Sequence, residues 1–428
     1  MEQVNQSAKL LIDKEVEGGL LASPLFWRQM ASEDGESDWI WGIVTTEFDL
    51  EQDGSVTVIQ LLRGSAESLL LTTLKGFEVY EGDAVTVGDW DGDGENELIV
   101  IDADGQLRVF RYEGRAVDGM VTHPVLETII RRRPAVATFG DGSRPILSFV
   151  SEAAPYIEAV GAVHAYQFPG QPLPGLPMEL DPPSISSVVM ATAQSGAKRL
   201  AFVRENGSIC VYDLSRKILH QIARVKPDLA DQTVIAAADV DADGRDEIIF
   251  AHGGDCVYAL SVSSERIQRS ILAQRADSEF VALAPGVKAD GQSILCFYDR
   301  GNRQFGFFSG GQLSWYEPED VDPSHKLISL STGPAIDEGG SAFVAVFYNP
   351  AGSIEILLLD SNANTVSDSP IRIKDFCPFI DGDTSMVLVP SVFYEASRSR
   401  LLLLAGLYPC GGDDPARVHM YEIDCSQR

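Results

Sequence analysis

Short apolar runs alternate with glycine- and asparagine-containing turns along most of this chain. The recurring unit is an apolar strand, a turn with Gly or Asn-Gly, and a second strand that ends near Val-Tyr or Val-Phe. Runs rich in β-branched and aromatic residues between such turns predict β-strands. Beyond the N-terminal segment no stretch keeps a helical hydrophobic period, so the chain is expected to be all-β.

The strand-turn-strand unit repeats along the chain. Eight copies can be placed, mostly 45 to 55 residues apart, at 69–80, 98–110, 146–166, 200–212, 248–260, 294–308, 343–359 and 401–421. Such a period is typical of β-propeller blades, which pack radially into a ring because one blade cannot bury both of its faces. We therefore expect a single propeller of seven or eight four-stranded blades over residues 39–428, with residues 1–38 as a short N-terminal extension and linker.

Several segments do not follow the repeat. Residues 8–16 predict a short helix, and the strand 39–48 is expected to complete the final blade and close the ring. The segments 151–160, 168–183 and 377–384 are interpreted as strandless insertions, of the kind that carry binding in propellers. The proline-rich 168–183 is the candidate partner-binding loop, and its alternative interpretation is a stiff connection between blades.

Two acidic loops share one spacing of carboxylates. Both Asp89 to Glu97 and Asp239 to Glu247 have the pattern D-x-D-x-D-G-x-x-E and continue directly into an apolar strand. Carboxylates at positions 1, 3 and 5, a carbonyl at position 7, an acid at position 9 and a turn-forming Gly at position 6 suit Ca²⁺. Plain Asp-Gly turns are the alternative, but clustered carboxylates repel one another unless a cation neutralises them, and this cluster occurs twice.

The setting of the loops distinguishes them from EF-hands. Position 12 is Val100 or Phe250 where an EF-hand has Glu, and the flanking segments are extended. From Asp89 to Asp239 is 150 residues, which predicts equivalent turns three blades apart. The shorter remnants 139–143 and 288–292 hold too few carboxylates to bind Ca²⁺.

The loops with their following aliphatic strands resemble FG-GAP repeats, as in integrin α-subunit propellers and bacterial proteins with VCBS repeats. The phrase 163–177, with its G-x-P-L-P-G-x-P turn, is similar to the bacterial form. The resemblance implies a Ca²⁺-binding β-propeller used mostly for binding and adhesion. It also implies two sets of Ca²⁺ ligands, with position 7 contributing its carbonyl: Asp89, Asp91, Asp93, Glu95 and Glu97, and Asp239, Asp241, Asp243, Arg245 and Glu247.

Charge narrows the classes of partner. The chain has 63 acidic residues against 33 Lys and Arg, a formal net charge of −30. This field repels phosphate backbones and anionic lipid, so nucleic acid is not an expected ligand, whereas cations and basic protein surfaces are favoured. The one basic run, 131–133, is interpreted as a solvated outer strand, with a docking patch for an acidic partner as the alternative.

Localisation depends on what precedes the chain. No apolar run reaches the ~18 residues of a transmembrane segment, and the charged first 20 residues do not match an intact signal peptide. The protein is expected to be periplasmic, secreted or at the cell surface if a signal was removed, and cytoplasmic otherwise. Cys210, Cys256 and Cys296 are interpreted as core residues, while Cys410 and Cys425 are candidates for a disulfide across a hairpin, with Cys377 as an odd third.

No catalytic motif is found. The six histidines are scattered without metal-ligand spacing, and His164 and His252 are interpreted as ordinary hydrogen-bonded residues. The leading hypothesis is a non-enzymatic, Ca²⁺-binding propeller that serves as a protein-binding, adhesion or assembly scaffold. The alternatives are a carbohydrate-active or glycan-binding propeller and a cytoplasmic scaffold subunit.

Overall fold

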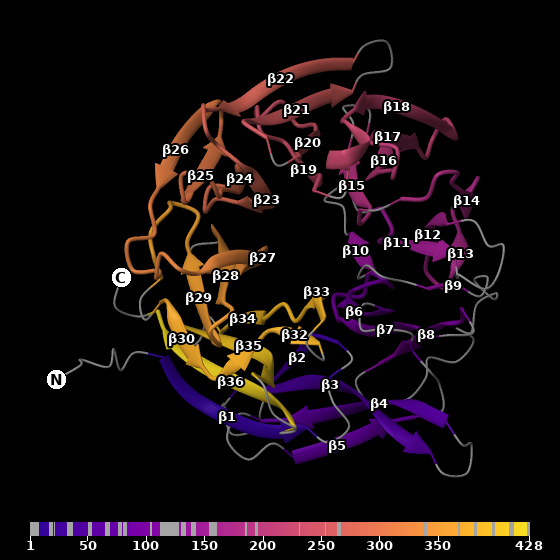
Figure 1. Ribbon diagram of the computed structural model, residues 1–428. Coiled ribbons are helices and arrows are strands. Elements are labelled where there is room, and N and C mark those ends of the chain that lie inside the picture. Colours follow the sequence, from indigo (N-terminus) through magenta and orange to yellow (C-terminus); the bar gives the residue numbers. More distant parts are fainter. Residues whose placement is uncertain are drawn as a thin grey trace.

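The fold is a closed ring of antiparallel sheets. In the computed structural model, eight blades follow one another around a central axis (Figure 1). The structure describes residues 8–16, 20, 22–31, 37–49, 54–64, 69–75, 79, 84–102, 105–111, 128–129, 134–137, 143–153, 161–184, 186–192, 196–230, 232–252, 254–262, 267–336, 340–366, 369–380, 383–395, 399–410 and 415–425.

Blades 1 to 4 occupy the first half of the chain. Blade 1 contains β2 (Leu25–Ala31), β3 (Ser37–Asp49), β4 (Gly54–Arg63) and β5 (Leu69–Leu74). Blade 2 contains β6 (Val85–Gly88), β7 (Glu97–Ile101) and β8 (Leu107–Phe110). Blade 3 contains β9 (Thr128–Ile129), β10 (Ala135–Ala137), β11 (Ile146–Ala153), β12 (Ala162–Gln167), β13 (Gln171–Pro172) and β14 (Met178–Glu179). Blade 4 contains β15 (Val189–Thr192), β16 (Lys198–Val203), β17 (Ser208–Asp213) and β18 (Ile218–Arg224).

Blades 5 to 8 complete the ring. Blade 5 contains β19 (Val234–Ala238), β20 (Glu247–Ala251), β21 (Cys256–Val262) and β22 (Ile267–Gln274). Blade 6 contains β23 (Phe280–Val287), β24 (Ser293–Asp299), β25 (Gln304–Ser309) and β26 (Gln312–Tyr316). Blade 7 contains β27 (Lys326–Ile336), β28 (Gly340–Asn349), β29 (Ser353–Leu359) and β30 (Ile371–Lys374). Blade 8 contains β34 (Ser391–Glu395), β35 (Arg400–Pro409), β36 (Ala416–Asp424) and β1 (Ala8–Val16), while β31 (Phe376–Cys377) pairs with β35 and β32 (Phe379–Ile380) pairs with β33 (Asp383–Val387).

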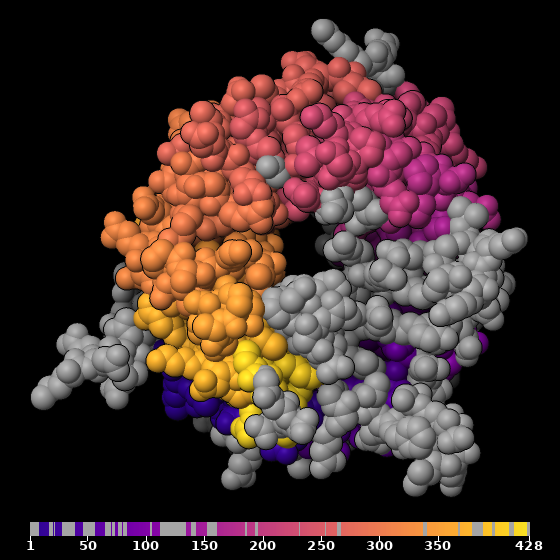
Figure 2. Space-filling model, viewed as in Figure 1, coloured from indigo at the N-terminus to yellow at the C-terminus, as the bar shows by residue number. Residues whose placement is uncertain are grey.

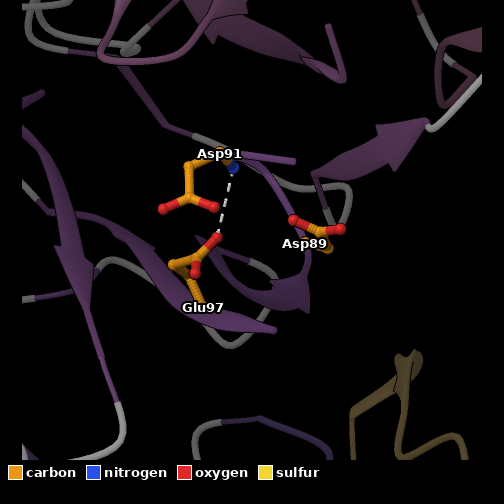
Figure 3. A group of neighbouring side chains, drawn as sticks. All are labelled: Asp89, Asp91 and Glu97. Atoms are coloured by element: carbon orange, nitrogen blue, oxygen red, sulfur yellow. Dashed lines mark hydrogen bonds between the residues drawn. The ribbon is translucent and has the colours of Figure 1, made fainter. Parts of the chain in front are cut away.

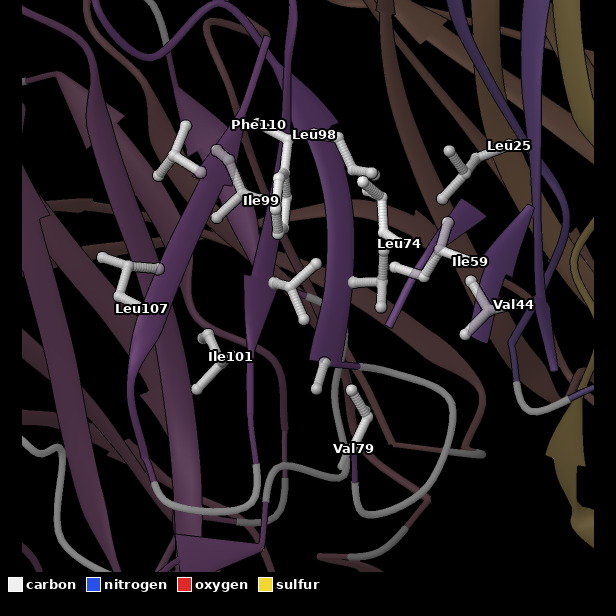
Figure 4. Packing of buried hydrophobic residues seen from close by; sticks show 14 of the residues in the cluster. Leu25, Val44, Ile59, Leu74, Val79, Leu98, Ile99, Ile101, Leu107 and Phe110 are labelled. Atoms are coloured by element: carbon white, nitrogen blue, oxygen red, sulfur yellow. The ribbon is translucent and has the colours of Figure 1, made fainter. Parts of the chain in front are cut away.

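The core lies between neighbouring blades. Most first strands of successive blades contact one another around the axis: β2 with β6, β6 with β10, β15 with β19, β19 with β23, β23 with β27, β27 with β34 and β34 with β2. Every residue of β7 and of β20 is buried, because these strands have a blade against each face. Figure 4 shows this packing where Leu25 and Ile59 of blade 1 lie beside Leu98 of blade 2. Burial on both faces explains the near-continuous apolar runs in the sequence.

Seven of the predicted repeat copies correspond to the second and third strands of a blade. The copy at 69–80 is wrong, because Leu69–Leu74 is β5, the outermost strand of blade 1. The equivalent pair in that blade is β3 and β4, joined in register from Ile40 opposite Arg63 to Asp49 opposite Gly54. The outer strand was mistaken for an inner one because its sequence, LLLTTL, is as apolar as an inner strand.

The ring closes through the N-terminal segment. The helix predicted over 8–16 is wrong, since these residues form β1, which pairs with β36 from Ala8 opposite Ile423 to Val16 opposite Ala416. Figure 1 shows indigo β1 alongside yellow β36. The prediction that 39–48 closes the ring is also wrong, because Ser37–Asp49 is β3, the second strand of blade 1. Thus the segment before residue 38, expected to be an extension, contributes β1 and β2 to the sheets.

A bulge explains why β1 was missed. The register shifts between Leu10 and Ile12, so strict alternation of apolar and polar positions is lost. Ile12 and Val16 are buried against blade 1 and blade 8, while Leu10 is 46% exposed. The resulting spacing of four between the two buried positions mimics one face of a helix.

The segment 168–183 is part of blade 3. Its residues form β13 and β14, which both pair with β12. Leu173, Leu176 and Leu180 are buried in the core between blades 3 and 4. The expectation of a strandless, dispensable insertion is therefore wrong: cutting this segment would uncover a hydrophobic core. The segment 377–384 likewise contains short strands, and most of 151–160 lies outside the described residues.

Helical structure is minor in the part of the chain that the structure describes. A 3-10 turn at Pro227–Leu229 precedes β19. No helix among these residues is both long enough and apolar enough to cross a membrane.

The closing strand yields a test of ring closure. Replacing Ile12, which is 6% exposed, with Ala should lower the free energy of unfolding by about 2 kcal/mol or more, since it leaves a cavity in the closing blade. The matched control is Leu10→Ala on the same strand, which should change stability by less than about 0.5 kcal/mol. Urea denaturation monitored by tryptophan fluorescence measures both. Equal effects of the two substitutions would contradict closure by β1.

Candidate metal sites

Both acidic loops occupy the same place in their blades. The first connects β6 to β7 in blade 2, and the second connects β19 to β20 in blade 5. Each is therefore the turn between the first two described strands of its blade, and the two lie three blades apart. The predicted setting and spacing of the loops are confirmed.

Three carboxylates converge in each loop. One oxygen each from Asp89, Asp91 and Glu97 lies within 4.8 Å of the others. Figure 3 shows the three side chains at the turn. The corresponding residues Asp239, Asp241 and Glu247 meet the same criterion in the second loop. Positions 1, 3 and 9 of the pattern thus come together in both loops. Oxygens at this separation can be bridged by one hard cation with ligand distances of about 2.4 Å.

Backbone hydrogen bonds hold the two loops in the same shape. The position 6 N–H of Gly94 donates to Asp89 Oδ2 at 3.0 Å, and that of Gly244 donates to Asp239 Oδ2 at 2.9 Å. At position 9, Glu97 Oε2 accepts from the Trp90 N–H at 2.9 Å, and Glu247 Oε2 accepts from the Val240 N–H at 3.2 Å. The carboxylates therefore fold the loop as well as concentrate charge in it.

The glutamate at position 9 has a strongly raised pKa in both loops. Glu97 and Glu247 are 1% and 2% exposed, respectively. Burial, with added repulsion from Asp91 and Asp93, raises the pKa of Glu97 to about 7. Burial and repulsion from Asp241 and Asp243 raise the pKa of Glu247 to about 7 in the same way. Without a cation, ionisation of these two carboxyl groups is disfavoured relative to that of an exposed glutamate.

The residues at positions 5 and 7 are not part of the carboxylate triad formed by positions 1, 3 and 9. Asp93 Oδ1 accepts from the Glu95 N–H at 2.8 Å, and Asp243 Oδ1 accepts from the Arg245 N–H at 3.0 Å. The Arg245 side chain also approaches Asp243 Oδ2 at 3.3 Å. The position 5 carboxylates thus stand beside the cluster rather than in it, and position 7 offers only its carbonyl.

The loops are unequal at position 3. Arg111, just beyond β8, forms an ion pair with Asp91 in the first loop. Among the described residues no cationic side chain is recorded on Asp241. A cation bound in the first loop would compete with the Arg111 guanidinium for Asp91. In the second loop a cation would meet no such competition from the described residues. The second site is therefore expected to be the stronger one.

Positions 2 and 8 connect each loop to the neighbouring blades. In the first loop, Asn96 exchanges hydrogen bonds with Trp27 of blade 1 (2.7 and 3.2 Å). The indole of Trp90 is buried on the other side, 5.7 Å from the Phe168 ring, and its N–H donates to the Tyr166 carbonyl of blade 3 at 3.3 Å. One loop therefore ties blades 1, 2 and 3 together.

The second loop repeats this arrangement with different residues. Asp246 Oδ2 accepts from the Thr192 N–H of blade 4 at 2.6 Å, and the Asp246 N–H donates to the Thr192 carbonyl at 2.9 Å. Val240 is buried with Phe280 and Phe297 of blade 6. Blades 4, 5 and 6 are tied in turn. Sequence reasoning missed these roles, although the apolar residue at position 2 and the amide or acid at position 8 recur in both copies.

Position 4 was also overlooked. Gly92 has φ of +82° and Ala242 has φ of +62°, so this position adopts a left-handed backbone in both loops. Ala pays a steric cost there that Gly does not. The signal was present in the sequence, because one copy carries Gly at this position.

The Ser–His contact of blade 3 is closed to substrate. His164 Nε2 lies 2.8 Å from Ser151 Oγ, but the two residues are 1% and 0% exposed. The imidazole stacks on Phe149 at 4.6 Å, and burial lowers the pKa of His164 to about 4. This histidine is a neutral, hydrogen-bonded core residue. The basic run 131–133 lies outside the described residues.

A pocket opens toward the axis at the junction of blades 1, 2, 7 and 8. It has a volume of about 470 Å³. Figure 2 shows, as a separate feature, the hollow at the middle of the ring. The described lining of the pocket has no charged side chain; aromatic rings and polar groups alternate there, including Phe26, Trp27, Asn96, Thr332 and Phe393. Asn96 belongs to the first acidic loop, so this pocket borders a candidate metal site.

Comparisons with known proteins show likeness of fold alone. No family model matches the chain, and no curated protein does. A BBS1N–ARL6DN crystal structure contains a chain 15% identical, with 82% of this chain and 94% of that chain covered and a TM-score of 0.44. A protein from Lactobacillus plantarum is 14% identical over 78% and 98% of the two chains, with a TM-score of 0.40. U3-55K is 11% identical over 81% and 100%, with a TM-score of 0.43.

Asp246 provides a test of the inter-blade tie. Asp246→Ala removes the acceptor for the Thr192 N–H and should destabilise the protein by about 1–3 kcal/mol. Asp246→Asn keeps a carbonyl acceptor and should remain within about 0.5 kcal/mol of the native protein. Burial and the nearby Asp239 raise the pKa of Asp246, so loss of its charge is not costly. Urea midpoints measured with chelator present compare the variants; a matching loss in Asp246→Asn would show that charge, rather than the hydrogen bond, matters.

Proposed function

We propose that this protein is a non-catalytic binding scaffold, an FG-GAP-type propeller in which each acidic loop holds one Ca²⁺ ion and locks three consecutive blades. The observation that supports it most directly is the duplicated carboxylate triad with its duplicated hydrogen bonds. A turn needs two or three such bonds, but not three converging negative charges, one of them buried. Burial, and after it repulsion from the neighbouring aspartates, raises the pKa of Glu97 and Glu247; a divalent cation would remove the repulsion and favour the charged carboxylates.

The chemistry of the ligands favours Ca²⁺ over other cations. All the converging atoms are carboxylate oxygens, which suit hard cations, and the chain places no His or Cys in either triad. Ca²⁺ accepts the irregular geometry of a short loop more readily than Mg²⁺ does. With the ligand set that the resemblance implies, Asp93 and Asp243 and the carbonyls of Glu95 and Arg245 would complete the two shells.

The role proposed for the ions is structural. Each loop is attached to its neighbours through position 2 and position 8, so fixing the loop also fixes both blade junctions. An ion used for chemistry would instead face a substrate-sized cleft. The ring would then present a rigid acidic surface that attracts a protein partner with a basic face, and sites of modest affinity would be filled by millimolar Ca²⁺ outside the cytoplasm.

A glycan ligand is a second candidate, favoured by the pocket at the axis. Aromatic rings with neighbouring hydroxyl and amide groups suit the apolar and polar faces of a sugar. Glycoside hydrolysis needs two carboxyl groups flanking the scissile bond, and the described lining of this pocket supplies none. The pocket therefore supports binding rather than cleavage of a glycan.

Ca²⁺ binding is tested by calorimetry and thermal melting. We expect two binding events, the weaker at the loop containing Asp91 because Arg111 competes there. At 100 times Kd each ion should add about 2.7 kcal/mol of stability. Asp91→Ala and Asp241→Ala should each remove one event, and the double variant should melt identically with Ca²⁺ and with chelator.

The control is a matched turn. Asp290 lies in the β23–β24 turn of blade 6, and its Oδ1 accepts from the Gln292 N–H at 2.9 Å, but among the described residues it belongs to no carboxylate triad. Asp290→Ala should leave both binding events intact. Titrations near pH 7 in buffers of different ionisation enthalpy should also show proton release, since Glu97 and Glu247 must ionise. Native protein that melts at one temperature with and without Ca²⁺ would refute the proposal.

Partner binding requires a separate experiment. Immobilised native protein should retain specific proteins or glycans from a source extract in Ca²⁺, and release protein partners as salt rises from about 50 to 300 mM because screening weakens charge attraction. The Asp91→Ala/Asp241→Ala variant should retain less in Ca²⁺, whereas Asp290→Ala should match the native protein. A partner whose retention ignores salt would contradict the acidic docking surface, and turnover of a retained glycan would contradict a non-catalytic role.

A further inference from the structure

Three cysteines follow blade 7 in sequence, and two of them meet. Cys377 is in β31, and Cys410 comes directly after β35. These strands are antiparallel, with Cys377 opposite Tyr408 and Phe376 opposite Pro409. One step further, the Cys410 N–H donates to the Asp375 carbonyl at 3.1 Å. Because side chains alternate along a strand, Cys377 and Cys410 lie on the same face of this pair.

The two thiols are neighbours on this face. After burial of the sulfur, the adjacent Cys377 thiol is the main cause that raises the pKa of Cys410, while the Tyr348 side chain of blade 7 acts to lower it. Cys377 is 8% exposed, whereas Cys410 is exposed to solvent. The Cys410 thiol can therefore react with an oxidant in solution, whereas the Cys377 thiol is shielded from solvent. Both are reduced in this structure.

The disulfide considered from sequence, Cys410 with Cys425, is excluded. In the β35–β36 hairpin, Leu407 is opposite Arg417 and Arg400 is opposite Asp424. Cys410 thus follows one end of the hairpin, whereas the Cys425 N–H donates to the Ser399 carbonyl at the other end, roughly 35 Å away at ~3.3 Å per residue. A disulfide requires Cα atoms within about 7 Å. Cys210, Cys256 and Cys296 are buried in three separate blades.

We propose that Cys377 and Cys410 form a reversible disulfide that joins the crossover strand β31 to β35 of blade 8. The oxidant is a small-molecule disulfide such as oxidised glutathione. The Cys410 thiolate attacks one glutathione sulfur, forming a mixed disulfide and releasing one reduced glutathione. The Cys377 thiolate then attacks the Cys410 sulfur, forming the protein disulfide and releasing the second. The two protein thiols lose two protons and two electrons, and oxidised glutathione becomes two molecules of reduced glutathione.

The position of the pair gives the bond a structural effect. Strand β31 contacts β29 of blade 7 as well as β35 of blade 8. The Asp375 N–H donates to the Gly352 carbonyl in the β28–β29 turn at 2.8 Å. A disulfide here would fasten the passage between blades 7 and 8, next to the blade that closes the ring. Such a cross-link stabilises the folded state by restricting the unfolded chain.

Exchange at this site should be slow at neutral pH. Although Cys410 as a residue is exposed, its sulfur is partly buried; this partial burial and the neighbouring Cys377 thiol raise the pKa of Cys410, so its thiolate is scarce. The thiolate is the attacking species, and the rate should therefore increase as pH rises from 7 to 9.

Peptide mapping of the full chain tests the disulfide. Trypsin places the three cysteines in different peptides, 375–398, 401–417 and 418–428. After incubation with oxidised glutathione and alkylation of remaining thiols, we expect 375–398 linked to 401–417 and an intact mass reduced by two hydrogen atoms. Dithiothreitol should reverse both changes. The oxidised protein should also melt a few degrees higher than the reduced protein.

Two variants complete the experiment. Cys425→Ser should leave the linked peptide unchanged, and Cys377→Ser should replace it with a stable glutathione adduct on Cys410. The proposal is overturned if native Cys410 ends as that adduct while Cys377 is alkylated, if the link includes 418–428, or if it joins two copies of the chain. An oxidised protein that melts no higher than the reduced protein would overturn the stabilising role.

Discussion

The pairing of β1 with β36 is the contact on which the rest of the ring depends. A blade buries its apolar strands only when another blade covers each face, and in an open array the two end blades would expose one face each. Here the strand from the start of the chain completes the sheet built from its end. Tyr408 reinforces this closure by bonding both the N–H and the carbonyl of Leu20 (2.7 and 2.8 Å). Burial in every blade is therefore shared, and loss of closure would weaken all eight together.

Ring closure does not remove the repulsion among the carboxylates of the acidic loops. The same carboxylates that bond the loop N–H groups also repel one another, and Glu97 and Glu247 are buried where ionisation is disfavoured. Protonation relieves this repulsion at low pH and a bound cation would relieve it at neutral pH, so the turn geometry and the proposed ion would stabilise the same conformation. Trp90 and Val240 extend that stabilisation into the next blade, and Asn96 and Asp246 extend it into the preceding one.

Features that depend on neighbouring residues in the sequence were predictable, whereas features that depend on contacts with distant segments were not. The all-β propeller, seven of its repeats and the position of both acidic loops followed from periodicity and spacing. The errors arose where a distant partner decides the structure. The bulge in β1 gives its buried residues a helix-like spacing, and β5 is as apolar as an inner strand. In 168–183 the many prolines suggested a loop, although its leucines are buried in the core. Within the site, the roles of positions 2 and 8 could not be inferred, because hydrogen bonds to another blade leave no local periodicity. The Cys377–Cys410 contact was likewise invisible, since it depends on a two-residue strand.

The proposed ties are distributed so that they complement one another. The first loop spans blades 1 to 3, the second spans blades 4 to 6, and the cysteine pair lies at the passage from blade 7 to blade 8. The remaining junctions have ordinary hydrogen bonds. Between blades 3 and 4, the Tyr212 hydroxyl donates to the Pro174 carbonyl at 3.2 Å, and between blades 6 and 7 the Val287 N–H donates to Ser341 Oγ at 2.9 Å. Compartments rich in Ca²⁺ are also those in which disulfides persist. The ions would therefore bind, and the disulfide form, together outside a reducing cytosol and both would be absent within it. The rigidity of this ring would then depend on its surroundings as well as on its sequence.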